Sequence, residues 1–128
     1  MNSKTVIRPA KAAPPVGPYS QAVRAGDLLF CSGQIPIDPS QPSAPLPADL
    51  RAQTERVLEN VKLILDDQGL TFGHVVKSTV FMTDLGDFAA MNEVYARYFT
   101  ADFPARSTVQ VAGLPRGAAV EIEVIARY

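Results

Sequence analysis

Residues 103–111, Phe-Pro-Ala-Arg-Ser-Thr-Val-Gln-Val, decide the fold together with residues 120–126, Val-Glu-Ile-Glu-Val-Ile-Ala. In both segments apolar and polar side chains alternate with the period of two that is typical of a β-strand. This alternation places Arg106 and Thr108 on one face of the first strand, and Glu121 on the polar face of the second. Glycine and proline between the segments indicate a turn. We therefore predict a hairpin that brings Arg106 and Glu121 within reach of each other.

The length and composition indicate one domain spanning residues 1–128. A chain of 128 residues is long enough to bury one core but too short for two. Its formal net charge of -1 gives no support to nucleic-acid binding, which requires a basic surface. No apolar run is long enough for a membrane span or a signal peptide. We therefore expect a cytoplasmic protein whose partners include neither nucleic acid nor a membrane.

Cysteine and histidine are too few in this chain to form a metal site. The single cysteine, Cys31, and the single histidine, His74, have no partners at metal-ligand spacing. The chain also contains neither a phosphate-binding loop nor a dinucleotide-binding glycine motif. We interpret Cys31 as a small buried apolar residue, and we expect no metal and no cofactor.

The remaining segments predict an α+β fold with two layers. A helix is expected over residues 49–68, because Asp49 can cap its start and apolar residues recur at helical spacing until Gly69. A second helix is expected to start at Asp84 or Asp87. Strands are predicted near residues 5–9, 20–25, 28–31 (ending at Ser32-Gly33) and 75–82, besides the two described above. The order β-β-β-α-β-α-β-β predicts a two-layer sandwich, a mixed β-sheet with two helices on one face.

A two-layer sandwich leaves one sheet face uncovered. We expect this face to carry Arg106, Thr108, Glu121 and Glu123 among apolar residues, which is more than an ordinary solvated face needs. Other copies of the chain would cover it, so the pattern predicts a homo-oligomer with sites at subunit boundaries.

Arg106 and Glu121 are the first candidates for a functional site. A guanidinium group can grip a carboxylate with two parallel hydrogen bonds, although an interface ion pair is the simpler interpretation. Glu121 lies between Val120 and Ile122 and could activate a water as a general base; a solvent-facing strand residue is the alternative.

Three further residues, Tyr19, Ser32 and Gly33, are candidates for lining a pocket. The phenol of Tyr19 could bond a ligand, and Ser32-Gly33 could present backbone N–H groups to an oxygen or anion. Ordinary packing and a strand-ending turn are the competing interpretations. Asn92, next to the apolar stripe of the second helix, is interpreted as structural.

Residues 104–109, 114–115 and 120–123 form one group of motifs, and further motifs are residues 17–21, 32–36, 53–61, 77–81, 84–85 and 88–92 with Tyr95. In these motifs the chain resembles the RidA/YjgF family of reactive intermediate (enamine/imine) deaminases. The first group is similar to the C-terminal signature of that family, and the further motifs follow in the family's order over nearly the whole chain.

This resemblance implies a chorismate-mutase-like fold, a homotrimer with sites at the subunit interfaces, and an enzyme that needs no metal or cofactor. It implies hydrolysis of 2-imino acids or enamines, such as 2-iminobutanoate and 2-iminopropanoate released by pyridoxal-phosphate enzymes, to 2-keto acids and ammonia. Arg106 would grip the substrate carboxylate and Glu121 would orient or activate water. Tyr19, Ser32 and Gly33 would line the pocket.

One position departs from the family. Many members carry cysteine two residues after the arginine, where this chain has Thr108. A hydroxyl of similar size can still hydrogen-bond, but it cannot act as a thiolate. The substitution leaves the hydrolytic scheme intact and puts the substrate preference in question.

Three other functions stay open from the sequence. One is a non-catalytic trimeric module that binds small carboxylates or acts like a chaperone, and another is a deaminase of a divergent substrate. The third is the ribonuclease activity attributed to some family members, against which the near-neutral charge argues.

Overall fold

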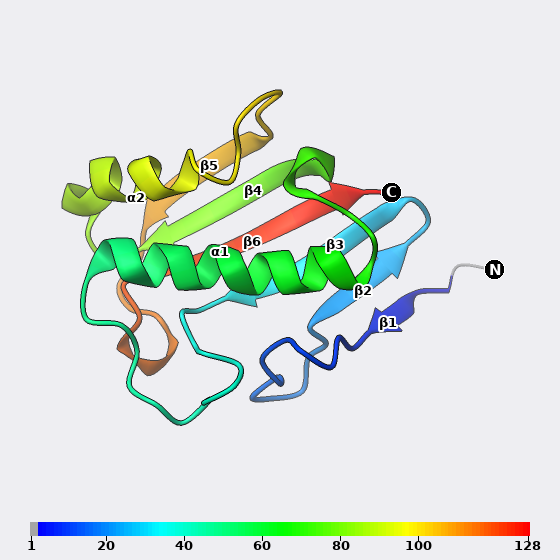
Figure 1. The fold of residues 1–128 in the computed structure, drawn as a ribbon, viewed down its shortest axis with the longest axis horizontal. Coiled ribbons are helices and arrows are strands. Elements are labelled where there is room, and N and C mark those ends of the chain that lie inside the picture. The colour runs from blue at the N-terminus through cyan, green and yellow to red at the C-terminus, as the bar shows by residue number, and fades with distance from the viewer. Residues whose placement is uncertain (1–2) are drawn as a thin grey trace.

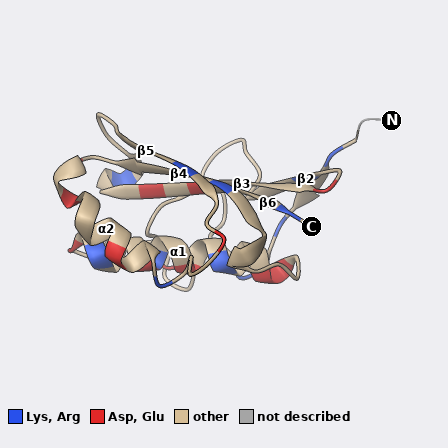
Figure 2. Cartoon of the chain, turned by 90° about the horizontal axis from the view of Figure 1, so that it is seen from above, with Lys and Arg blue, Asp and Glu red and all other residues tan. Residues whose placement is uncertain are grey.

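The structure is a computed structural model that describes residues 3–128, and these residues form two layers (Figure 1). One layer is a six-stranded sheet in the order β1-β2-β3-β6-β4-β5. The other contains two α-helices, which lie on the same side of the sheet (Figure 2). The strands are β1 (Thr5–Ile7), β2 (Ala22–Ala25), β3 (Leu28–Gln34), β4 (Val75–Met82), β5 (Ala105–Gln110) and β6 (Val120–Arg127), and the helices are α1 (Leu50–Asp67) and α2 (Phe88–Tyr95). The predicted α+β sandwich is confirmed.

Helix α1 begins and ends where its sequence predicts. The Asp49 carboxylate accepts a hydrogen bond from the Ala52 N–H at 2.8 Å and so caps the first turn. Gly69 follows the helix with a φ of 70°, a conformation that costs glycine little and other residues more. The apolar stripe of the helix is fully buried against the sheet and comprises Val57, Leu58, Val61, Ile64 and Leu65.

The helix-facing side of the sheet supplies the other half of the core. Alternate residues of two interior strands are fully buried there, namely Val80 and Met82 in β4 and Val120 and Ile122 in β6. Because neighbouring side chains along a strand point to opposite faces, the residues between them lie on the open face. This alternation assigns each candidate residue to one face.

The predicted hairpin between the last two strands is wrong. Within the described residues, β5 pairs with β4 alone and runs parallel to it, whereas β6 pairs antiparallel with both β3 and β4. A parallel neighbour needs a crossover connection, and α2 provides it between β4 and β5. Strand β6 then pairs with the other edge of β4. Alternation correctly identified two strands, but it contains no information on which strands pair.

Strand β3 does not stop at Ser32-Gly33, as predicted, but continues to Gln34. Cys31 pairs with Val124 and Gln34 pairs with Ile122, so β3 contains one residue more than β6 between these pairs. Such a bulge redirects side chains locally. Here it lies beside Glu121, so the irregularity falls at a candidate functional residue.

The open face of the sheet combines apolar and charged side chains. Phe30 and Val109 remain 40% and 42% exposed there, and Glu121 and Glu123 lie on the same face. The prediction that Arg106 and Thr108 belong to this face is wrong, because both point toward the helix layer. No helix in residues 3–128 combines the length and the apolar character needed to cross a membrane.

Candidate functional site

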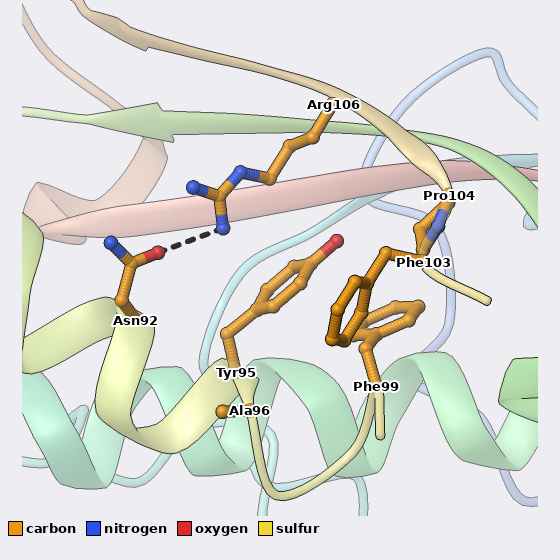
Figure 3. Close-up of a pocket in the computed structure, with 7 residues that line it drawn as sticks. All are labelled: Asn92, Tyr95, Ala96, Phe99, Phe103, Pro104 and Arg106. Carbon is orange, nitrogen blue, oxygen red and sulfur yellow. Dashed lines mark hydrogen bonds between the residues drawn. The ribbon is translucent and has the colours of Figure 1, made fainter. Parts of the chain in front are cut away.

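Arg106 lies on β5 with its side chain between the sheet and α2 (Figure 3). Its register partner on β4 is Ser78, which is fully buried on the helix-facing side. The Arg106 Nη1 donates a hydrogen bond to the Asn92 Oδ1 at 2.8 Å. This bond uses one of the five guanidinium N–H donors, so the half-buried cation is held in position while it keeps donors for a ligand.

Aromatic rings also support the guanidinium. The Arg106 Cζ lies 4.8 Å from the centroid of the Tyr95 ring and 5.6 Å from that of Phe88, both within the range of cation–π attraction. The Tyr95 hydroxyl is itself fixed, because it shares a 2.7 Å hydrogen bond with the buried Ser78 hydroxyl. Burial raises the pKa of the Tyr95 phenol above its ordinary value, so this group stays a neutral support for the arginine.

A cavity of about 360 Å³ adjoins Arg106. The residues around it come from α2, the segment after α2 and the start of β5, and they are Asn92, Tyr95, Ala96, Phe99, Phe103, Pro104 and Arg106 (Figure 3). Most of these side chains are apolar. A carboxylate held by the arginine would therefore place the rest of its molecule beside a largely apolar wall.

Thr108 follows Arg106 on the same face of β5. Its Oγ1 atom is buried and forms no hydrogen bond to any described residue. A buried hydroxyl without a partner is costly, so the hydrogen-bonding capacity of this atom is left unused within the described chain. The structure thus places Arg106 and Thr108 together, and it adds Asn92 and Tyr95; these four residues are here called the Arg106 group.

Glu121 lies on β6 and on the other side of the sheet. Its neighbours Val120 and Ile122 are fully buried on the helix-facing side, so the Glu121 side chain must point to the open face. Partial burial raises the pKa of the Glu121 carboxyl above its usual value, and the neighbouring Glu123 carboxylate raises it further. A carboxylate with a raised pKa binds a proton more readily, which suits a general base.

Gly33 makes room for this carboxylate. A Cβ atom built on Gly33 would overlap the Glu121 Oε2 and would lie 2.8 Å from its Cδ, which is closer than such atoms approach. The backbone of the β3 bulge therefore lies directly against Glu121. Glycine is needed here for close approach and not for an unusual φ.

Tyr19 and Ser32 lie near the same bulge. They line one hollow of about 370 Å³, and Tyr19 and Gly33 line a smaller one of about 30 Å³. The Ser32 hydroxyl donates to the Ser20 carbonyl at 2.6 Å, and the Tyr19 hydroxyl accepts from the Val16 N–H at 3.2 Å. We refer to Tyr19, Ser32, Gly33 and Glu121 as the Glu121 group.

The six predicted site residues therefore form two groups on opposite faces of the sheet. The prediction that Arg106 and Glu121 meet within one chain is wrong, because it rested on the hairpin. The registers explain the outcome: Arg106 pairs with Ser78 of β4, whereas Glu121 pairs with Phe81, three residues further along. An odd separation along a strand changes the face.

Sequence reasoning missed the contributions of Asn92, Tyr95 and Phe103. Asn92 was interpreted as structural, and it does bond Arg106. Its helical spacing from Tyr95, three residues on, puts both side chains on one side of α2; that spacing was the available signal.

The cysteine and metal predictions concern the rest of the chain. Cys31 is buried, as predicted, and burial raises the pKa of its thiol to about 12. In residues 3–128, no three metal-ligating side chains are grouped.

Comparisons with known proteins agree with this architecture. A family model described as Endoribonuclease L-PSP matches residues 10–128. Protein DfrA of Myxococcus xanthus is 54% identical over 126 residues, which cover 97% of this chain and 95% of DfrA. TdcF of Escherichia coli is 47% identical over 126 residues, or 96% of each chain, and its name assigns it provisionally to the reactive intermediate deaminases.

Solved structures give the same result. A structure of Escherichia coli TdcF with bound serine superposes with a TM-score of 0.91 at 46% identity, and covers 97% of this chain and 98% of its own. RidA from the Antarctic bacterium Psychrobacter sp. superposes with a TM-score of 0.92 at 44% identity, with coverage of 97% and 99%.

The fold places the chain in a class of small α+β proteins with two helices packed on one face of a mixed six-stranded sheet. Within that class, the chain belongs to the RidA/YjgF family of reactive intermediate deaminases. The resemblance inferred from the sequence motifs is confirmed.

Proposed function

We propose that this protein hydrolyses reactive 2-imino acids, or their enamine tautomers, to 2-keto acids and ammonia. The proposed substrates are imines such as 2-iminobutanoate and 2-iminopropanoate, which pyridoxal-phosphate enzymes release. The observation that carries the proposal is the fixed guanidinium of Arg106, bonded to Asn92 at 2.8 Å and stacked on Tyr95 beside a cavity. A 2-imino acid offers a carboxylate directly next to its reactive carbon, so holding that carboxylate also positions the carbon.

The chemistry needs orientation and a placed water more than it needs a strong catalyst. An imine carbon is electrophilic, and fixing both reactants in an attacking geometry lowers the entropic part of the barrier. Water adds to the imine carbon while Glu121 accepts one of its protons. The imine nitrogen gains protons and leaves as ammonia, and the carbon–oxygen bond becomes the ketone. One imine and one water thus give one 2-keto acid and one ammonia.

Two copies of the chain would have to combine for this reaction. Arg106 and Glu121 lie on opposite faces of one sheet, so the Arg106 of one copy would meet the Glu121 group of a neighbour. The open face supports such an assembly, because both α-helices lie on the other side of the sheet (Figure 2) and Phe30 and Val109 each remain about two-fifths exposed on it. We infer a homotrimer with three sites at its interfaces.

The other site residues complete this scheme. Thr108 would donate or accept a hydrogen bond through its unpartnered Oγ1. Ser32 and the Gly33 backbone would line the side of the shared site that carries Glu121. The Tyr19 phenol would complete that side. Each of these groups binds or orients a reactant, and none needs to form a covalent bond with it.

The test is a coupled assay with wild type and Arg106→Ala. An amino-acid oxidase or threonine dehydratase generates the imine, and semicarbazide traps what escapes enzymatic hydrolysis. Wild type should lower the trapped fraction. Arg106→Ala should lose about 30-fold to 150-fold in kcat/KM, because a charge-assisted contact to a carboxylate contributes roughly 2–3 kcal/mol. Equal trapping with wild type, the variant and no enzyme would contradict the proposal.

A module that only binds small carboxylates is separated from an enzyme by Glu121→Ala. The enzyme should lose turnover while it retains keto-acid binding through Arg106, whereas a binding module has no turnover to lose.

The family description also names an endoribonuclease. RNA cleavage with a steep salt dependence would favour that activity, for which the net charge of -1 offers no support.

A further inference from the structure

The cavity beside Arg106 has a chemical character that goes beyond holding a carboxylate. Its walls include the rings of Tyr95, Phe99 and Phe103 together with Pro104, and Tyr95 and Phe99 stack with their centroids 4.3 Å apart. Such a surface is well suited to an apolar or aromatic group. The volume of about 360 Å³ is far more than a methyl group needs.

Two of the polar atoms that line the cavity already have partners within the chain. The Asn92 Oδ1 accepts from Arg106 at 2.8 Å, and the Tyr95 hydroxyl is bonded to Ser78 at 2.7 Å. Apart from the guanidinium, the lining residues carry no charge. Apart from the guanidinium and the Asn92 amide, a polar or charged side chain entering this cavity would give up water and meet mainly apolar walls.

The geometry of a 2-imino acid connects these two observations. Its carboxylate and its side chain are attached to the same carbon, so a carboxylate on Arg106 leaves the side chain within a few bonds of the cavity. Resting on the proposed function, we infer that this cavity holds the substrate side chain. The protein then prefers 2-imino acids with an aromatic or large branched apolar side chain over the 2-imino acid derived from alanine.

Phe103 is the residue best placed to determine this preference. It forms one wall of the cavity, yet it is 71% exposed, so shortening it should change the cavity without disturbing the core. Ala96 offers the opposite change. It is exposed at the end of α2 and also lines the cavity, so Ala96→Leu should fill the space that a large side chain needs.

A D-amino-acid oxidase supplies the test imines from D-phenylalanine, D-leucine and D-alanine, with spontaneous hydrolysis subtracted. Wild type should hydrolyse the phenylalanine imine with a kcat/KM about tenfold or more above that of the alanine imine, as expected for an added apolar contact. Phe103→Ala and Ala96→Leu should each reduce this ratio at least about threefold. Leu85→Ala removes an apolar side chain that is 40% exposed and outside the cavity, and it should leave the ratio unchanged.

The outcomes distinguish the two claims. If the alanine imine is hydrolysed but the ratio is near one, or is the same in all four proteins, the inference is overturned and the proposed function stands. If wild type hydrolyses none of the three imines, the proposed function is overturned and the inference with it. Size-exclusion chromatography of each variant establishes that the assembly is unchanged.

Discussion

Arg106 and Glu121 lie on opposite faces of the same sheet, although only strand β4 separates the strands that carry them. Arg106 is paired with the buried Ser78, and Glu121 with Phe81 on the open face. One copy of the chain therefore cannot apply both groups to one small molecule. A site that contains both groups therefore requires two copies of the chain.

The first prediction concerns Gly33. In Gly33→Ala the new Cβ would overlap the Glu121 carboxylate, and this carboxylate is the movable end of a flexible side chain. We expect a loss of stability of about 1 kcal/mol, at the low end of what overpacking costs, while kcat/KM falls about 100-fold because the base is displaced by roughly an ångström. Urea denaturation and the coupled imine assay measure the two effects.

Gly113→Ala is the matched control for that variant. A Cβ at Gly113 meets nothing within 4 Å, so the variant should retain wild-type kcat/KM. Full activity in Gly33→Ala would show that the position of the Glu121 carboxylate does not matter to the reaction.

The second prediction concerns pH. Desolvation first, and the Glu123 carboxylate second, raise the pKa of Glu121. Because a general base must be ionised, kcat/KM should fall as the pH is lowered through this pKa, and the fall should begin above the range of an ordinary glutamate. Glu123→Gln removes the smaller cause, so the acid limb should move to lower pH but remain raised by burial. A limb that stays in place or moves to higher pH would contradict the role of Glu121.

The third prediction uses Thr108. Thr108→Val keeps the shape of the side chain and removes a buried hydroxyl that has no partner in the described chain. The free energy of unfolding should stay the same or rise by up to about 1 kcal/mol. If the hydroxyl bonds the substrate, kcat/KM falls about tenfold, and Thr108→Ser restores it. A fully active valine variant would remove Thr108 from the site.

Much of the fold could be predicted from local signals. The Asp49 cap and the Gly69 stop locate α1, and the alternation of residues 75–82 matches β4. These features depend on backbone hydrogen bonds and burial within one segment. The order of the elements follows from them, and so does the two-layer architecture.

The pairing of strands and the faces of the site depend on longer-range contacts. Alternation shows that Arg106 and Thr108 share a face, but the choice of face depends on pairing with β4. The support of Arg106 by Asn92 spans 14 positions of the chain, and no local pattern predicts it. The bulge at Ser32-Gly33 could not be predicted either. A Ser-Gly pair is compatible both with the end of a strand and with a bulge that makes room for a carboxylate, and the sequence does not distinguish the two.

The central claim, a site shared between copies, is tested most directly by mixing two inactive variants. Arg106→Ala and Glu121→Ala are each purified, unfolded together in equal amounts and refolded into mixed oligomers. If Arg106 of one subunit works with Glu121 of its neighbour, about a quarter of the sites in a random cyclic trimer regain both groups, and about a quarter of the wild-type deaminase activity returns. If each site is built within one chain, no mixed oligomer contains an intact site and activity stays at the level of the separate variants.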